Sequence, residues 1–435
     1  MDTALHSPAE QALIATAERV LPAGSFGNMA GDLVIREGRG ARVWDESGRE
    51  YVDFLLGSGP MLVGHAHPEV TAAVQAQVAL GTTFFANNRH GIRLAEAIVA
   101  AVPCAEQVRF VSTGSEADLY AMRAARAYTK RDKILKFEGG YHGMSDYSLM
   151  SLAPKRPGNL PRAIPDSAGI PASVRDEMVI APFNDIDATA GLVREHKNAL
   201  AAVIVEPFQR IIPPTPGFLA DLRTLTAEHG IPLIFDEVVT GFRLAYGGAQ
   251  EYYGVTPDLC SLGKVIGGGF PLAAIAGKAE IMAHFDQAKV GDDGFLKQIG
   301  TLSGNPVAAV AGLACLEILH RPGAYETIFK TGRMLMQSLD EKLKRAGIPA
   351  QVIGEPPCFD VVFTTATAPI RNYRDMLSAD PALTRRFNAL VRERGILKSE
   401  QKYYVSLAHT PADVRLTQDA WDDAIKQLTK ERSRG

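Results

Sequence analysis

The chain has 435 residues, of which 46% are hydrophobic and 22% charged, as in a globular protein with a sizeable core and two or three structural units. Its formal net charge of -3 provides no basic field for nucleic acid and no polybasic membrane patch, so we expect neither partner. The four cysteines (Cys104, Cys260, Cys315 and Cys358) are scattered without a CxxC pair. We therefore expect reduced core thiols, no disulfide framework and no metal site.

The first residues, Met1-Asp2-Thr3, lack the basic and apolar segments of an export signal. No apolar run in the chain is long enough to predict a transmembrane helix. Together with the cysteine usage, these features favour a cytoplasmic protein that does not bind a membrane.

The N-terminal part of the chain is predicted to form a segment of a small lobe, residues 1–65. Ser7-Pro8-Ala9-Glu10 has the pattern of a capping box with proline at the first helical position, which predicts a helix to about Leu21. Residues 41–45 and 51–54 flank a turn-rich segment and predict a hairpin.

Residues 66–320 alternate between short apolar strands and amphipathic helices. The predicted strands are residues 108–111, 133–137, 201–205, 232–235 and 259–262, with helices between them, as at 115–129 and 216–229. This alternation predicts an α/β fold with a mostly parallel sheet covered by helices on both faces. Residues 321–435 begin with a long predicted helix, about 324–346, and then mix strands and helices in an α+β C-terminal domain.

Two features place charged groups at the sheet edge where ligands of such folds bind, beyond the carboxyl ends of the strands. The strand 232–235 is followed by two carboxylates, Asp236 and Glu237, and carboxylates at the end of a buried strand need a positively charged partner. Lys264 follows the strand 259–262 and precedes three glycines, so a large group can approach its amine. Taken alone, Lys264 is more readily explained as a surface lysine on a flexible loop.

Two further features supply an anion site and an aromatic ring. Residues 112–115, STGS, join a strand to a helix N-terminus, where free N–H groups and hydroxyls bind phosphate, although the same pattern also fits a plain helix cap. Residues 141–143, YHG, follow the strand 133–137, and a solitary aromatic there is more often core. Together, the four features describe a phosphorylated heteroaromatic aldehyde, with Lys264 forming an imine and Asp236 keeping a ring nitrogen protonated.

A nucleotide-binding α/β protein is a competing interpretation of the glycine-rich segment around Lys264. The segment lacks the GxxxxGK[ST] pattern, and no GxGxxG opens a helix after the first strand, so we disfavour it. A homologue that has lost its activity is disfavoured because Lys264, Asp236 and the phosphate motif occur together.

Ordered motifs run along nearly the whole chain. They include GARVWDESGREYVDF, STGSEA, RDKILKFEGGYHG, VEPF, FDEVVTGFR, LGKVIGGGFPLAA, GTLSGNPVA and SLAHT. In their order and spacing the chain resembles the class III aminotransferases, which are fold-type I pyridoxal-phosphate enzymes, and within them most the glutamate-1-semialdehyde 2,1-aminomutases. The resemblance implies a large PLP-binding domain at residues 66–320 and a small α+β lobe built from both ends of the chain.

By motif matching, the resemblance implies a role for each site residue. Lys264 carries pyridoxal 5'-phosphate as an imine and moves the proton, while Asp236 pairs with the pyridine nitrogen. The other implied cofactor contacts are Val238 and Tyr141 on the ring faces, Thr113, Gly114 and Ser115 at the phosphate, and Glu206 and His142 beside the ring. Thr301 completes the phosphate site of the neighbouring subunit, which implies a homodimer with its active site at the subunit interface.

Three positions depart from the aminomutase pattern. Ala30 falls where those enzymes carry the arginine that grips the substrate carboxylate, an aromatic residue is lost within residues 57–61, and Gln401 falls at an acidic position. An arginine–carboxylate contact in a desolvated pocket is a strong one, so its loss changes the substrate. We therefore predict an aminotransferase that moves an amino group from an amino acid or amine donor to a 2-oxo acid. The alternative is a glutamate-1-semialdehyde 2,1-aminomutase, or a related mutase or racemase that needs no acceptor.

Possible pocket residues are Arg243, Arg89, Lys402 and the pair Phe84-Phe85, although surface charge or core packing explains each of them more readily. Residues 150–175 lie where the aminomutase has a mobile lid, and their composition fits a loop.

Overall fold

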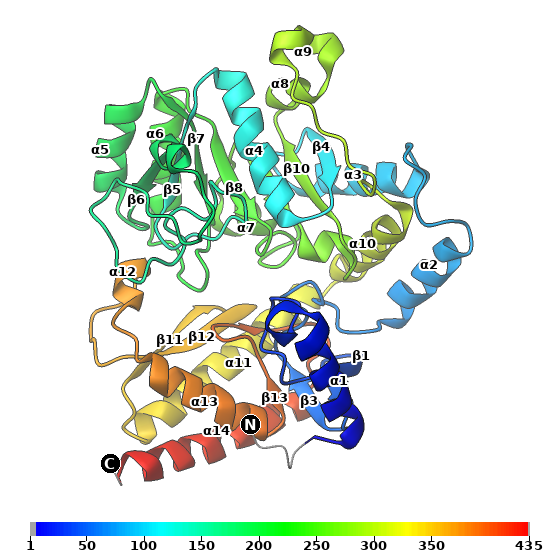
Figure 1. Ribbon diagram of the computed structural model, residues 1–435, viewed down its shortest axis with the longest axis vertical. Helices are drawn as coiled ribbons and strands as arrows, with labels where there is room; N and C mark the ends of the chain where they lie inside the picture. Colours follow the sequence, from blue (N-terminus) through cyan, green and yellow to red (C-terminus); the bar gives the residue numbers. More distant parts are fainter. Residues whose placement is uncertain (1–5, 434–435) are drawn as a thin grey trace.

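The computed structural model describes residues 6–433 and shows an upper lobe built on a seven-stranded sheet and a lower lobe that holds both ends of the chain (Figure 1). Met1-Asp2-Thr3, on which the prediction about export rests, lie outside the described residues.

The large sheet is mixed and mostly parallel. In spatial order its strands are β4 (Gln107–Val111), β10 (Ala273–Gly277), β9 (Leu259–Leu262), β8 (Leu233–Glu237), β7 (Leu200–Val205), β5 (Lys133–Phe137) and β6 (Met178–Ala181). β9, β8, β7, β5 and β6 pair in parallel, and β10 is antiparallel to both β9 and β4. The prediction of a mostly parallel sheet is therefore confirmed. β6 and β10 were not predicted from the sequence. β10 consists mainly of alanine and glycine, which have little strand preference.

Helices cover both faces of this sheet. In the upper lobe they are α2 (Pro68–Val78), α3 (Arg89–Ala101), α4 (Gly114–Thr129), α5 (Ile186–His196), α6 (Phe218–Glu228), α7 (Gly248–Tyr253), α8 (Ala279–Met282), α9 (Gln287–Gly294) and α10 (Pro306–Leu319). Along β8, Leu233 and Phe235 belong to one hydrophobic cluster, whereas Ile234 belongs to a second one that includes Ala117 and Ala121 of α4. This alternation decides where the polar residues at the strand end point.

The lower lobe joins segments from both ends of the chain. One sheet combines β1 (Ile35–Arg39), β2 (Arg42–Asp45) and β3 (Glu50–Asp53) with β13 (Ile396–Leu397), and a second contains β11 (Ala350–Glu355), β12 (Cys358–Phe363) and β14 (Tyr403–Tyr404). Its helices are α1 (Pro8–Val20), α11 (Ala324–Arg345), α12 (Tyr373–Met376), α13 (Pro381–Glu393) and α14 (Pro411–Arg432). The predicted hairpin is confirmed as β2 and β3, and the predicted long helix as α11. The division at residues 65 and 320 stays a prediction.

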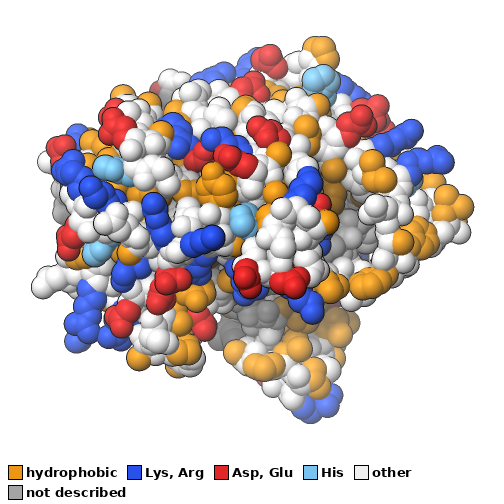
Figure 2. Space-filling view, turned by 90° about the horizontal axis from the view of Figure 1, so that it is seen from above, with side chains coloured by type: hydrophobic (Ala, Val, Ile, Leu, Met, Phe, Trp, Pro, Cys, Tyr) orange, Lys and Arg blue, Asp and Glu red, His pale blue; other side chains and the backbone are white. Residues whose placement is uncertain are grey.

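Large apolar side chains are exposed in the loop after α2. Leu80, Phe84 and Phe85 are 75%, 51% and 72% exposed. Figure 2 shows hydrophobic side chains gathered at the right-hand edge of the face seen from above, the side on which α2 lies in Figure 1. Such a patch is typical of a surface that another protein covers.

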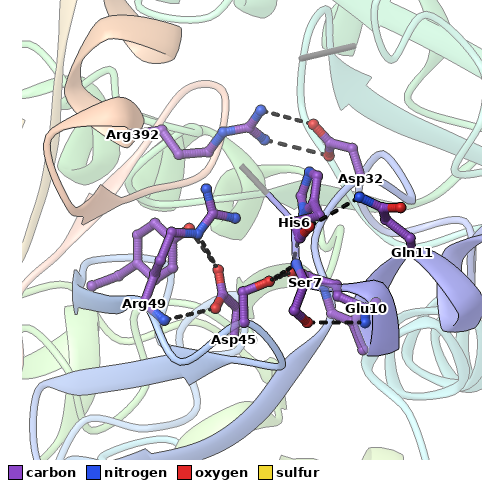
Figure 3. Close-up of polar contacts among 11 residues, drawn as sticks. His6, Ser7, Glu10, Gln11, Asp32, Asp45, Arg49 and Arg392 are labelled. Atoms are coloured by element: carbon purple, nitrogen blue, oxygen red, sulfur yellow. Dashed lines mark hydrogen bonds and ion pairs between the residues drawn. The ribbon is translucent and has the colours of Figure 1, made fainter. Parts of the chain in front are cut away.

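Polar contacts hold α1 on the lower lobe (Figure 3). Ser7 caps the helix by accepting a hydrogen bond from the backbone N–H of Glu10, as predicted. The reciprocal half of the predicted capping box is wrong, because the Glu10 carboxylate turns away and accepts a hydrogen bond from the Ser47 hydroxyl. Nearby, Arg392 of α13 pairs with Asp32 at 2.7 Å, which ties the N-terminal segment to the C-terminal one.

Of the described helices, none alone is long and apolar enough to cross a membrane, and α10 and α11 reach that length and hydropathy only when they are joined across a bend of 77°.

Candidate active site

The end of strand β8 sends its two carboxylates to opposite faces of the sheet, because neighbouring strand residues alternate. Glu237 accepts hydrogen bonds from the backbone N–H of Ala249 at 2.6 Å and from the Thr240 hydroxyl at 2.9 Å. Burial raises the pKa of Glu237 to about 7. Glu237 is thus held by the start of α7, and Asp236, on the face of α4, is the carboxylate available to a ligand.

Asp236 lies in a buried network of polar groups. Its Oδ2 accepts a hydrogen bond from Nδ1 of His142 at 2.9 Å, and its Oδ1 accepts one from the backbone N–H of Val238 at 3.1 Å. The Ser261 hydroxyl donates to the same Oδ1 at 3.4 Å. His142 and Asp236 are 1% and 5% exposed. His142, which the resemblance places beside the cofactor, therefore orients Asp236.

Asp118, on α4, belongs to this network and was missed by the sequence analysis. The Ser261 hydroxyl donates to Asp118, which also hydrogen-bonds to Asp236. Burial, and next the negative charge of Asp236, raise the pKa of Asp118 well above its usual range, so Asp118 keeps its proton and donates it to Asp236. The sequence could have indicated Asp118 as a site residue by its spacing, because it follows Gly114 by one helical turn and so lies on the same helix face.

Lys264 lies in a tight turn between β9 and β10. Its φ of 49° is left-handed, a conformation that costs free energy for a residue other than glycine. Burial is the largest cause that lowers the pKa of its amine, and the charges of Lys402 and Arg243 lower it further. Tyr404 and Asp236 act in the opposite direction. Within residues 6–433 this amine has no ion-pair partner, and an unpaired amine with a lowered pKa is a nucleophile.

The start of α4 presents the donors expected of a phosphate site. Thr113 is the N-cap: its hydroxyl accepts a hydrogen bond from the Glu116 N–H, and its own N–H donates to the Glu116 carboxylate at 3.0 Å. Gly114 and Ser115 follow as the first helical residues, whose N–H groups have no acceptor within the helix. The Ser115 hydroxyl accepts a hydrogen bond from the Met144 N–H at 3.1 Å and keeps its own proton to donate.

Close packing joins this helix start to β8 and to Lys264. A Cβ added to Gly114 would lie 2.9 Å from Cγ1 of Val238, and one added to Gly263 would lie 3.2 Å from the same atom. Val238 therefore connects the start of α4 with the turn that carries Lys264. The helix start, Lys264 and the end of β8 border a single site.

Tyr141 and Glu206 border this site from the neighbouring strands β5 and β7. The backbone N–H of Tyr141 donates to Oε2 of Glu206 at 2.8 Å, and Glu206 is 5% exposed. The Arg210 guanidinium lies over the Tyr141 ring, 5.2 Å from its centroid. The structure thus brings both predicted residues together, with an arginine that the sequence analysis did not find.

Thr301 is exposed, and its carbonyl accepts a hydrogen bond from the Thr83 hydroxyl at 3.3 Å. In the described part of this chain no contact links Thr301 to the other predicted site residues, so its role in a neighbouring subunit stays a prediction. Of the possible pocket residues, Arg89 is exposed at the start of α3, whereas Arg243 and Lys402 are buried.

Residues 150–175 form largely a loop, which confirms that prediction, and buried contacts anchor it. Lys136 of β5 is fully buried and donates from Nζ to the carbonyls of Ser148 and Met150, both at 2.8 Å. Arg374 of α12 donates to the carbonyl of Gly158 at 2.8 Å. The loop is thereby attached to both lobes, and its role as a lid stays a prediction.

The donor set fits a cofactor that carries a phosphate, a ring nitrogen and an aldehyde. N–H groups and a hydroxyl at the start of α4 suit the phosphate, and a buried, oriented carboxylate suits a protonated ring nitrogen. A nucleophilic amine in the same site suits the aldehyde carbon.

Residues 25–364 match the family model of the class-III aminotransferases. Glutamate-1-semialdehyde 2,1-aminomutase 2 of Brevibacillus brevis is 40% identical over 433 residues, which cover 96% of this chain and 98% of that one. A solved omega-transaminase from Sphaerobacter thermophilus has a TM-score of 0.90 at 37% identity, covering 96% of this chain and 97% of its own. A transaminase with PLP bound has a TM-score of 0.88 at 32% identity, covering 97% and 98%. The predicted α/β fold of a fold-type I transferase is confirmed.

Proposed function

Because the chain belongs to the class III aminotransferases, which are pyridoxal-phosphate enzymes, we propose that it transfers an amino group from an amino acid or amine donor to a 2-oxo acid through a Schiff base at Lys264. The observation that carries this proposal is the unpaired amine of Lys264 in one site with the oriented carboxylate of Asp236. A nucleophile and a ring-nitrogen partner are the two groups that this chemistry requires.

Each residue of the buried network has a task in this proposal. The cofactor supplies an electron sink when it is bound. Asp236, oriented by His142 and by the protonated Asp118, keeps a proton on the pyridine nitrogen. The freed amine of Lys264 removes the proton from the carbon that bears the donor nitrogen and later returns a proton.

The remaining residues would hold the cofactor in place. The N–H groups of Gly114 and Ser115 and the Ser115 hydroxyl bind the phosphate, and the N–H of Thr113 is already used by the helix cap. Val238 and Tyr141 pack on the ring, with Glu206 on its phenolic side, as the resemblance implies.

An aminomutase is the second candidate, because the relative at 40% identity has that name. The exposed Ala30 in place of the substrate-binding arginine favours the transaminase. The two candidates differ in one requirement: a transaminase consumes a 2-oxo acid, whereas a mutase or racemase turns over without one.

We also propose that the active unit is a homodimer, in which Thr301 reaches the phosphate site of the partner. The exposed Leu80, Phe84 and Phe85 support this proposal, because a second copy would cover them. A complementation assay tests it. Mixing Lys264→Ala with Thr301→Ala protein should restore activity, because one of the two shared sites in the mixed dimer then carries neither change. No gain of activity on mixing would oppose a shared site. A cytoplasmic location stays a prediction from the sequence.

The absorbance spectrum of the purified holoenzyme tests the reaction itself. A panel of donors is added first without and then with pyruvate or 2-oxoglutarate. A donor that bleaches the visible imine band, which the 2-oxo acid then restores, supports a transaminase. Lys264→Ala should lose this band and almost all turnover, and Asp236→Ala should slow proton transfer by orders of magnitude with cofactor still bound. Near-normal rates in Asp236→Ala would contradict the assigned role.

A further inference from the structure

Two cations beside Lys264 are buried without a carboxylate partner. Lys402 is 6% exposed, and among the described residues its amine forms no ion pair. Arg243 is fully buried: Nε donates to the Val239 carbonyl at 2.9 Å and Nη2 to the Gly59 carbonyl, but the buried Nη1 has no partner. A buried charge without an opposite charge is costly, so these two cations favour an anion beside them.

The two other buried lysines of residues 6–433 have hydrogen-bond acceptors for their amines. Lys136 donates to two backbone carbonyls, and Lys398 pairs with Asp360 at 3.0 Å and donates to Asn388 at 3.1 Å. Lys402 differs from these two lysines because, among the described residues, its amine has neither a hydrogen-bond acceptor nor an ion-pair partner.

Aromatic rings place the cations around one space. The Lys402 amine lies 5.7 Å and the Arg243 guanidinium carbon 5.0 Å from the centroid of the same Tyr404 ring. Arg210, over the Tyr141 ring, likewise has no ion pair within the described chain. The charges of Lys402 and Arg243, together with Tyr404, act on Lys264, so these groups lie near the reacting amine.

Glu206 is the acid that the structure places near Lys402, and it is engaged elsewhere. Its carboxylate accepts hydrogen bonds from the backbone N–H groups of Tyr141, at 2.8 Å, and Arg210, at 3.5 Å, and forms no ion pair with Lys402 in the described residues. The phosphate donors lie at the start of α4. Within residues 6–433, no carboxylate therefore pairs with these cations, and the phosphate donors at the start of α4 form a separate site.

Gly59 makes room for this arrangement. Its φ of 108° favours glycine, and an added Cβ would lie 3.1 Å from Nη2 of Arg243 and 3.2 Å from the Tyr404 ring. A larger residue at this position would push the two side chains aside. Glycine at this position therefore leaves the space in which the Arg243 and Tyr404 side chains pack.

We propose that Lys402 and Arg210 bind the carboxylate of the substrate beside Lys264, with Arg243 positioning the Tyr404 ring next to Lys402, so that the preferred donor is an amino acid and not a plain amine. This inference rests on the proposed function and names the substrate class of the same site. It also explains how the enzyme functions without an arginine at position 30, because Lys402 of the C-terminal segment and Arg210 after β7 supply the positive charges for the carboxylate.

Binding of propionate to the holoenzyme tests the subsite separately from turnover. Propionate carries the carboxylate but no amine, and the bound cofactor blocks the phosphate site. Calorimetric titration of wild type, Lys402→Met and Lys402→Arg should give a Kd roughly 10- to 100-fold weaker for the Met variant, which retains the length but not the charge. The Arg variant should bind nearly as well as wild type. Lys426→Met, an exposed lysine of α14, is the matched control and should bind like wild type.

Turnover supplies a second readout with paired donors in which a methyl group replaces the carboxylate: alanine with isopropylamine, and 3-aminobutanoate with sec-butylamine. Lys402→Met should raise the KM for the acid of a pair far more than the KM for its amine, so that the preference of the enzyme for the acid is lost. Propionate that binds Lys402→Met as tightly as wild type, or does not bind wild type, would overturn the inference. A holoenzyme that binds propionate through Lys402 but is bleached by no donor would instead oppose the proposed function.

Discussion

The carboxylate subsite leads to a quantitative prediction for pH. Burial is the main cause that lowers the pKa of Lys402 to about 8, and the charge of Arg210 adds to it. At this pKa about nine-tenths of Lys402 is protonated at pH 7 and about one-tenth at pH 9. Because only the protonated amine attracts a carboxylate, we expect the Kd of propionate for the holoenzyme to rise about tenfold from pH 7 to pH 9.

Other groups around Lys402 keep their charge in this window. The groups that face it are Arg210, Arg243, Glu206, Cys358, Tyr404 and Lys264. Burial raises the pKa of Cys358 and of Tyr404, so both stay neutral, and the arginines stay charged. Lys264 is tied up as the proposed Schiff base, and propionate is ionised throughout.

Calorimetric titrations at pH 7, 8 and 9 check this prediction. Lys402→Arg should bind propionate equally well at each pH, because a guanidinium does not titrate there. Lys402→Met should bind weakly and also without a pH dependence. A wild-type Kd that does not change with pH, or an Arg variant that weakens as steeply as wild type, would refute the assignment of the titration to Lys402.

Two further predictions concern buried titratable groups. Asp118→Asn keeps a neutral side chain that accepts a hydrogen bond from Ser261 and donates one to Asp236, so its affinity for the cofactor should stay near that of wild type. Asp118→Ala should lose about 1–3 kcal/mol of cofactor binding free energy in a titration. Equal losses of affinity in the two variants would mean that Asp118 acts through its charge. Burial lowers the pKa of His409 from 6.5 to about 4. Between these two pKa values the unfolded state therefore binds a proton more readily than the folded state. The contribution of neutral His409 to the free energy of unfolding is complete above about pH 6.5 and is lost as the pH falls toward 4. The loss is about 2 kcal/mol at pH 5. Urea unfolding of wild type and His409→Asn at pH 7 and 5 should show a smaller acid loss in the variant; the same loss in both would contradict it.

The fold and the core of the site were predictable from local patterns. The apolar strand before Asp236 and the helix pattern after Ser115 have periods that specify their own secondary structure. Asp236 and Glu237 differ only by one position in a strand, and the period of two already implies that a single one of them faces α4. Which face belongs to α4 depends on tertiary packing, and for that reason Asp118, across the helix–sheet contact, was missed.

The carboxylate subsite was only partly predictable. Lys402 and Arg243 were possible pocket residues in the sequence, whereas Arg210 was not found, and the parts of the subsite compensate for one another across the chain. Compared position by position with the aminomutases, Ala30 and the missing aromatic residue within residues 57–61 are losses, and the altered acidic position falls on Gln401. The structure has Gln401 exposed, whereas the next residue, Lys402, is buried against Tyr404. Gly59 can be understood only with Arg243 and Tyr404 in place, since their side chains fill the space that a Cβ would need. A motif comparison scores each position separately, so it records these changes as a weakened site. In the folded chain, the changed positions lie around an anion site that differs in place from the arginine site of the aminomutases. The substrate class therefore has to be inferred from buried charges that lack partners.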